Sequence, residues 1–123
     1  SRGMVFPAAK MDRLQTLSLF LGNETGKDLP VTLHLRGTAD ISDLSSKQDL
    51  ATATASVPAG KQSWVTFTVD APVTTPGLWF FLTKAEGISW RFMTGAPAGC
   101  NRFYGDPATS SWTIREADPV RPS

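Results

Sequence analysis

The stretch 63–93 constrains the fold more than any other part of this chain. It holds three of the four tryptophans and four of the seven phenylalanines, and it opens with the alternating run 64–69 (WVTFTV). A period of two turns successive side chains to opposite faces, so this run predicts a strand with one apolar and one polar face. Residues 71–77 (APVTTPG) then interrupt the pattern, because proline lacks an amide donor and glycine accepts positive φ.

Two more segments of this stretch have the length and composition of strands. Residues 78–83 (LWFFLT) form an apolar run, residues 88–93 (ISWRFM) alternate, and 84–87 (KAEG) read as a short turn between them. Segments so close in sequence predict an antiparallel hairpin.

Loop length decides which side chains of that hairpin share a face. A three- or five-residue loop places Phe80 beside Trp90 on a wholly apolar face, and Trp79 opposite Arg91 on the other face. A four-residue loop would instead pair Phe81 with Trp90 and bring Arg91 opposite Phe80. We favour the first register because it keeps the Arg91 charge off the apolar face.

The rest of the chain has the composition of an all-β domain. It is 41% hydrophobic and 19% charged, and its nine prolines and ten glycines separate short alternating runs. Residues 38–49 are polar and acidic and predict a loop, and residues 5–7 predict an edge strand because they end in proline. The other strands are expected at 14–22, 31–36, 50–57 and 111–115, and residues 101–104 are expected to form a short strand or a loop.

We expect one domain over residues 5–115, followed by a linker-like tail at 116–123. Its fold class is a two-layer antiparallel β-sandwich, jelly-roll-like or, as an alternative, immunoglobulin-like. The abrupt start at residues 1–4 and the tail suggest a piece of a longer protein. The predicted core consists of Leu17, Leu19, Leu21, Val31, Leu33, Leu35, Val65, Phe67, Phe80, Trp90 and Phe92.

Charge and cysteine content argue against several classes of function. Twelve basic and eleven acidic residues leave a net charge of +1, which offers no field to attract nucleic acid or an anionic membrane. No apolar run is long enough to span a membrane. The single cysteine, Cys100, excludes an internal disulfide and a zinc site built from several cysteines.

Catalytic motifs are missing as well. His34 is the only histidine, neither a Gly-x-Ser-x-Gly elbow nor a phosphate-binding glycine loop occurs, and we expect a solvent-facing His34 and a packed Cys100. Asp40, Asp43 and Asp49 cluster in the polar loop and read as solvated acids. They could hold a structural calcium ion, although their spacing matches no known loop signature, and we expect no other cofactor.

Aromatic side chains are the remaining candidates for a site. Flat rings stack on the apolar C–H faces of sugars, and nearby polar side chains can bind hydroxyls or a carboxylate. The alternative is that these rings form a second packed surface or lie against a neighbouring domain. The favoured core face does not need all of the aromatic residues, and Trp64 is among those that are left over. The candidate ligand-binding residues are Trp79, Arg91, Arg102, Tyr104 and Trp112.

The strand and turn pattern resembles that of bacterial accessory β-sandwich domains, carbohydrate-binding modules among them. The resemblance spans most of residues 5–115 and rests on pattern, with no diagnostic motif. It is carried by Phe6, the strand 14–21, Asp49-Leu50-Ala51, the turn 57–60, and the segments 63–67 and 76–80. It implies a noncatalytic sandwich that could be stabilised by calcium and that either binds glycan or packs on a catalytic domain, within a larger secreted or cell-surface bacterial protein.

Two functions follow from these expectations. The first is a noncatalytic carbohydrate-binding module that targets an attached enzyme to a polysaccharide or oligosaccharide through exposed aromatic residues. It predicts that at least two of Trp79, Arg91, Tyr104 and Trp112 are exposed together. The second is a structural accessory domain that packs against a catalytic domain of the parent protein or another subunit, with the same rings buried at the interface.

Overall fold

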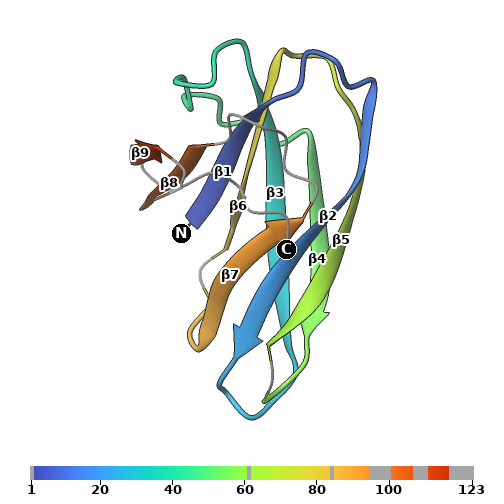
Figure 1. Ribbon diagram of the computed structural model, residues 1–123, viewed down its shortest axis with the longest axis vertical. Helices are drawn as coiled ribbons and strands as arrows, with labels where there is room; N and C mark the ends of the chain where they lie inside the picture. Colours follow the sequence, from blue (N-terminus) through green and yellow to red (C-terminus); the bar gives the residue numbers. More distant parts are fainter. Residues whose placement is uncertain (1, 61, 84, 95–100, 107–110, 117–123) are drawn as a thin grey trace.

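The computed structural model describes residues 2–60, 62–83, 85–94, 101–106 and 111–116, and the side chains of those up to residue 90. These residues form nine antiparallel strands in two packed sheets, which confirms the all-β sandwich (Figure 1). None of the described residues belongs to a helix, and so none lies in a helix that is long and apolar enough to cross a membrane. The strands are β1 (Arg2–Pro7), β2 (Arg13–Asn23), β3 (Leu29–Thr38), β4 (Ala51–Val57), β5 (Gln62–Pro72), β6 (Gly77–Leu82), β7 (Ile88–Thr94), β8 (Asn101–Asp106) and β9 (Ser111–Glu116).

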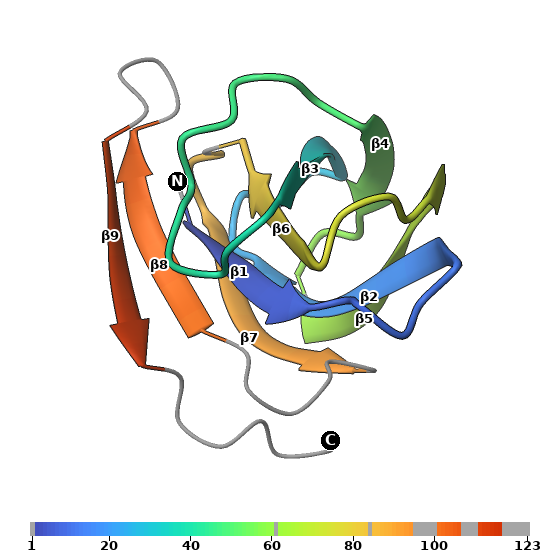
Figure 2. The same ribbon diagram turned by 90° about the horizontal axis from the view of Figure 1, so that it is seen from above.

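The two sheets differ in size. The larger has the strand order β4-β3-β6-β1-β8-β9 and the smaller the order β5-β2-β7. The pairs β1–β8, β2–β7 and β3–β6 are nested, and β4 and β5 contact each other where the two sheets meet. Such nesting favours the jelly-roll-like arrangement over the immunoglobulin-like one. Figure 2 shows the larger sheet curving round the smaller one, with β8 and β9 beyond β7.

The core lies between the sheets and follows from strand alternation. In β5 the burial pattern alternates strictly from Trp64 to Pro72, with Val65, Phe67 and Val69 buried. The nine residues of the predicted core from Leu17 to Phe80 are all buried, which confirms that part of the prediction. Trp90 is half-buried and packs against this cluster, whereas the Phe92 side chain lies outside the described part.

The predicted hairpin between residues 78–83 and 88–93 is wrong. Strand β6 pairs with β1 and β3 in the middle of the larger sheet, whereas β7 pairs with β2 in the smaller one. All six β6 residues are buried, because an apolar run without alternation needs cover on both faces. Phe80 and Trp90 do contact, with ring centroids 5.7 Å apart, but across the sandwich and not along a hairpin.

Strand β1 is also central, contrary to the predicted edge strand at 5–7. It lies between β6 and β8, and it begins at Arg2. Pro7 is tolerated because it is the last residue of the strand. Its missing amide hydrogen therefore removes no hydrogen bond from the middle of the sheet.

The polar segment 39–50 covers the outer face of the larger sheet. It places Leu44 and Ile41 over an apolar patch of Val5, Trp79 and Phe81. These side chains form a second core, separate from the one between the sheets. The loop was predicted from its polarity, but its role as a cover was not.

Candidate functional site

Trp79 lies in this second core. Its side chain has no exposed surface, and the Arg36 guanidinium carbon lies 5.3 Å from the ring centroid. A ring without exposed surface cannot stack on a ligand. The choice of Trp79 for an exposed aromatic site is therefore not supported by its place in the fold.

The other four candidate residues are placed by their backbone alone. Arg91 lies in β7, and Arg102 and Tyr104 lie in β8, where they are paired with Met4 and Arg2 of β1. Trp112 of β9 is paired with Gly105. Their side chains lie outside the described part of the chain, so their ligand contacts stay a prediction.

An exposed aromatic pair lies on the outer face of the smaller sheet. Trp64 of β5 is 42% exposed, one of two large hydrophobic residues exposed among the described side chains. It is paired across the ladder with the half-buried Phe20 of β2, and their ring centroids are 5.1 Å apart at an angle of 51°. Residue 92 of β7 is the backbone partner of Phe20 on the other side.

Hydroxyl groups continue this face along the two strands. The Ser18 and Thr66 hydroxyl oxygens lie 2.9 Å apart, and Thr16 is paired with Thr68 one step farther on. Same-face residues repeat about every 6.6 Å along a strand, so the face extends about 20 Å from residue 64 to residue 70. We call it the β2–β5 strip, made of Trp64, Phe20, Ser18, Thr66, Thr16 and Thr68.

An ion pair ends the strip. Arg13 donates from Nε to Asp70 Oδ1 at 2.7 Å and from Nη2 to the Asp70 carbonyl at 3.1 Å. This hydrogen bond, together with the opposite charge, lowers the pKa of Asp70 below its usual value and raises the pKa of Arg13. The two charges cancel, so the strip presents a neutral surface.

A second cluster of polar groups holds the loop 39–50 in place. Asp49 accepts hydrogen bonds from Arg36 Nε at 2.8 Å and from His34 Nδ1 at 2.9 Å. His34 also stacks on Phe81, with ring centroids 4.8 Å apart, and its Nε2 lies 3.2 Å from the Thr83 hydroxyl. The expectation of a solvent-facing His34 is wrong, because the loop returns over the sheet and brings Asp49 to it.

The acidic residues of this loop do not converge on a metal site. Asp40 and Asp43 each accept from Ser42 or Ser45 of their own turn, whereas Asp49 points to Arg36. Those local hydrogen bonds lower the pKa of both Asp40 and Asp43. Within the described residues no group of three histidine, cysteine or acidic side chains could hold a metal ion.

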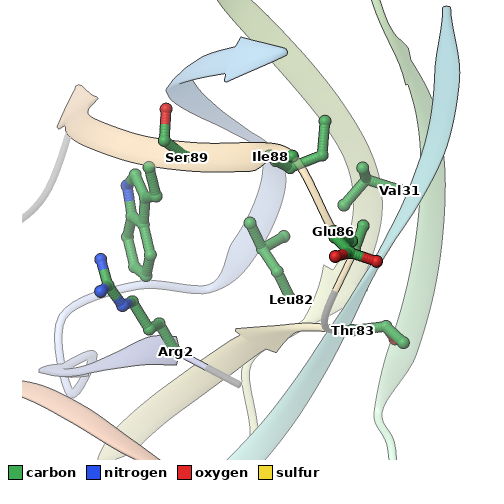
Figure 3. A pocket seen from close by; sticks show the side chains of 10 residues that line it. Arg2, Val31, Leu82, Thr83, Glu86, Ile88 and Ser89 are labelled. Atoms are coloured by element: carbon green, nitrogen blue, oxygen red, sulfur yellow. The ribbon is translucent and has the colours of Figure 1, made fainter. Parts of the chain in front are cut away.

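A pocket of about 450 Å³ opens at one end of the sandwich, where the β6–β7 connection leaves the larger sheet (Figure 3). Its lining includes Val31, Leu82 and Ile88 together with Trp90. Arg2 and Glu86 lie at its rim and are exposed. Residue 104, one of the predicted ligand-binding positions, is the backbone partner of Arg2.

Sequence reasoning recognised Trp64 as a surplus aromatic residue but did not choose it, and it missed Phe20. The signal was present in the alternation of 16–20 (TLSLF) and 64–69, which turns Thr16, Ser18 and Phe20 to one face. What was not available from the sequence is that β2 and β5 are neighbours.

No protein-family model matches the chain, and no curated protein or solved structure shows significant similarity to it. A function must therefore be argued from the described surfaces. Of these, the β2–β5 strip combines an exposed ring with an extended row of hydrogen-bonding groups.

Proposed function

We propose that this chain is a noncatalytic carbohydrate-binding module that binds a polysaccharide or oligosaccharide along the β2–β5 strip. In that role it would hold an attached catalytic domain on its polysaccharide, as part of a secreted or cell-surface bacterial protein. The observation that carries the proposal is the exposed ring of Trp64, which lies beside Phe20 at one end of a row of hydroxyl groups.

The exposed part of Trp64 can supply useful binding energy. An aromatic side chain presents up to about 250 Å², so 42% exposure leaves about 100 Å² for a ligand to cover. At about 25 cal/mol per Å² this burial is worth about 2.5 kcal/mol, or about sixtyfold in affinity. Ser18, Thr66, Thr16 and Thr68 then supply donors and acceptors along the direction of the strand.

The composition of the strip favours a sugar chain over other partners. Its neutrality offers no attraction to nucleic acid or to an anionic surface. The exposed apolar surface of the strip is concentrated at Trp64 at one end, whereas a protein interface has an apolar centre with a polar rim around it. A sugar chain, with apolar ring faces and many hydroxyls, matches both the ring and the row of Ser and Thr side chains.

Affinity gel electrophoresis with a panel of soluble polysaccharides tests this proposal. We expect retarded migration with one class of glycan, and loss of the retardation in Trp64→Ala. Leu50→Ala is a matched control, because Leu50 is 41% exposed but lies at the end of the loop 39–50, just before β4 of the other sheet. Thr66→Val, which removes one hydroxyl of the strip at constant shape, is expected to weaken the retardation without abolishing it.

Three results would count against the proposal. Equal retardation of Trp64→Ala and the wild type would place the glycan elsewhere, and equal loss in Leu50→Ala would show a nonspecific effect. Free migration of the folded wild type with every glycan would favour the alternative function. That alternative is a structural domain that packs against a catalytic domain or another subunit.

A further inference from the structure

The end pocket lies on the opposite side of the smaller sheet from the strip. Its walls come from the inner side of the sandwich: Val31 and Leu82 belong to the core cluster between the sheets, and Trp90 and Ile88 pack against that cluster. The strip lies on the outer face of β2 and β5. A ligand in the pocket would therefore not touch the strip.

The middle of the pocket suits an apolar ring. Val31 and Leu82 are buried and Ile88 is half-buried, so the lining there is aliphatic. The half-buried Trp90 adds an aromatic wall that is held by Phe80, with 5.7 Å between ring centroids and 45° between ring planes. A cavity of about 150 Å³ holds a benzene molecule. The volume of about 450 Å³ therefore has room for one ring with substituents on both sides.

Opposite charges mark the two ends. Figure 3 shows Arg2 at one end of the pocket and Glu86 at the other, with Leu82 and Ile88 between them. Neither charged side chain forms an ion pair or a side-chain hydrogen bond with any residue in the described part of the chain. A guanidinium only donates and suits a carboxylate, whereas an ionised carboxylate only accepts and suits a hydroxyl or ammonium group.

We propose that the end pocket is a second binding site, for a small amphiphilic molecule with an apolar ring, a carboxylate at one end and a hydrogen-bond donor at the other. The ring lies against Trp90 over Leu82 and Ile88. The carboxylate binds Arg2 and the donor group binds Glu86. This site does not depend on the proposed glycan function.

Nuclear magnetic resonance on the whole chain with 3-(4-hydroxyphenyl)propionate as the probe tests the proposal. The indole N–H signals are followed during titration, and Trp90→Phe and Trp64→Phe identify the two signals that matter. We expect a saturable shift of the Trp90 signal with a dissociation constant of about 1 mM or lower, and no shift of the Trp64 signal.

Variants and probe analogues separate the two charged ends. Arg2→Gln is expected to weaken binding about tenfold, the usual effect of losing a charge-assisted hydrogen bond, and 4-ethylphenol, which lacks the carboxylate, should bind equally weakly to both proteins. Glu86→Ala is expected to weaken the probe about fivefold but to leave 3-phenylpropionate, which lacks the hydroxyl, unchanged. Both side chains are exposed, so neither variant should affect folding.

The proposal is overturned by any of three outcomes. These are a Trp90 signal that does not saturate with the probe, binding that is unchanged in Arg2→Gln, and 4-ethylphenol binding as tightly as the probe. Glycan retardation of the same samples reports on the strip separately, so failure at the pocket would not be confused with failure of the glycan function.

Discussion

Asp49→Ala is expected to destabilise the domain more than its place in a surface loop suggests. The carboxylate bridges Arg36 and His34, and it fastens the loop 39–50 over Trp79 and Phe81. The Arg36 side chain is 10% exposed and that of Asp49 30%. Removal of the carboxylate would leave a largely buried guanidinium without its counter-ion.

The magnitude of the loss lies between two limits. Breaking a fully buried ion pair costs about 3–5 kcal/mol, and an exposed pair contributes about 0–1 kcal/mol. The Arg36 guanidinium would keep its hydrogen bond to the Ser46 carbonyl at 3.2 Å and its contact with Phe81, 4.9 Å from the ring centroid. We therefore expect Asp49→Ala to lower the free energy of unfolding by about 2–3 kcal/mol, or the melting temperature by about 8–12 °C.

The pH dependence follows from the same contacts. Partial burial raises the pKa of Asp49, but the hydrogen bonds and charges of Arg36 and His34 outweigh it and hold the pKa below 3.8. A depressed pKa stabilises the folded state at pH values above 3.8, and the contribution is lost as the pH falls from there through the folded-state value. The difference between wild type and Asp49→Ala should therefore shrink at strongly acidic pH.

Urea unfolding followed by circular dichroism at pH 7 and at pH 3 provides the measurement. Asp43→Ala is the matched control, since Asp43 lies in the same loop and its carboxylate accepts only from Ser45 of its own turn among the described residues, while its backbone bond from Thr38 survives the substitution. The reasoning would be refuted by a loss below about 0.5 kcal/mol at pH 7, the range of ordinary surface substitutions, or by a loss no larger than that of Asp43→Ala.

Three further predictions concern the frame around the candidate sites. Asn23→Ala should cost about 2–3 kcal/mol in urea unfolding, because Asn23 is 3% exposed and its amide donates to the Lys27 and Val57 carbonyls. Residues 23–25 (NET) match the N-glycosylation triplet, and mass spectrometry after expression in a glycosylating host should find Asn23 unmodified; a sugar on it would contradict the buried position. Gly87→Ala should lower the melting temperature more than Gly26→Ala, although both glycines have positive φ. A Cβ added at Gly87 would lie 2.5 Å from Thr25 Cγ2, whereas one added at Gly26 would meet nothing, so equal shifts would speak against this contact. Leu35→Ala should cost about 2–5 kcal/mol by calorimetry, because Leu35 is fully buried between the sheets, and a loss under 1 kcal/mol would show that the core relaxes around it.

The positions of most strands, and the buried faces of β2, β3 and β5, could be predicted from the sequence, because alternation is a local property of the chain. Residues 64–69 show this most clearly: Val65, Phe67 and Val69 are buried, and Trp64 on the other face is exposed. The all-β class and the two-layer packing follow from repeating this pattern between turns.

The pairing of the strands could not be predicted in the same way. A short connection after residue 82 is compatible with a hairpin, and it is also compatible with a crossing from one sheet to the other, which the chain makes between β6 and β7. Strand β6 takes a central place because both of its faces are apolar, and only the complete sheet supplies cover for both.

The same division applies to the candidate site. The four tryptophans are the same residue type in the sequence. Residue type alone does not distinguish a ring that binds a ligand from a ring that belongs to the core. Alternation along β5 by itself determined that Trp64 points away from the core of the domain. Only the tertiary structure decided that the loop 39–50 covers Trp79, and that Trp64, Phe20 and a row of hydroxyls share one face. The physical reason is that burial depends on which distant segment packs over a side chain, and short-range pattern does not contain that information.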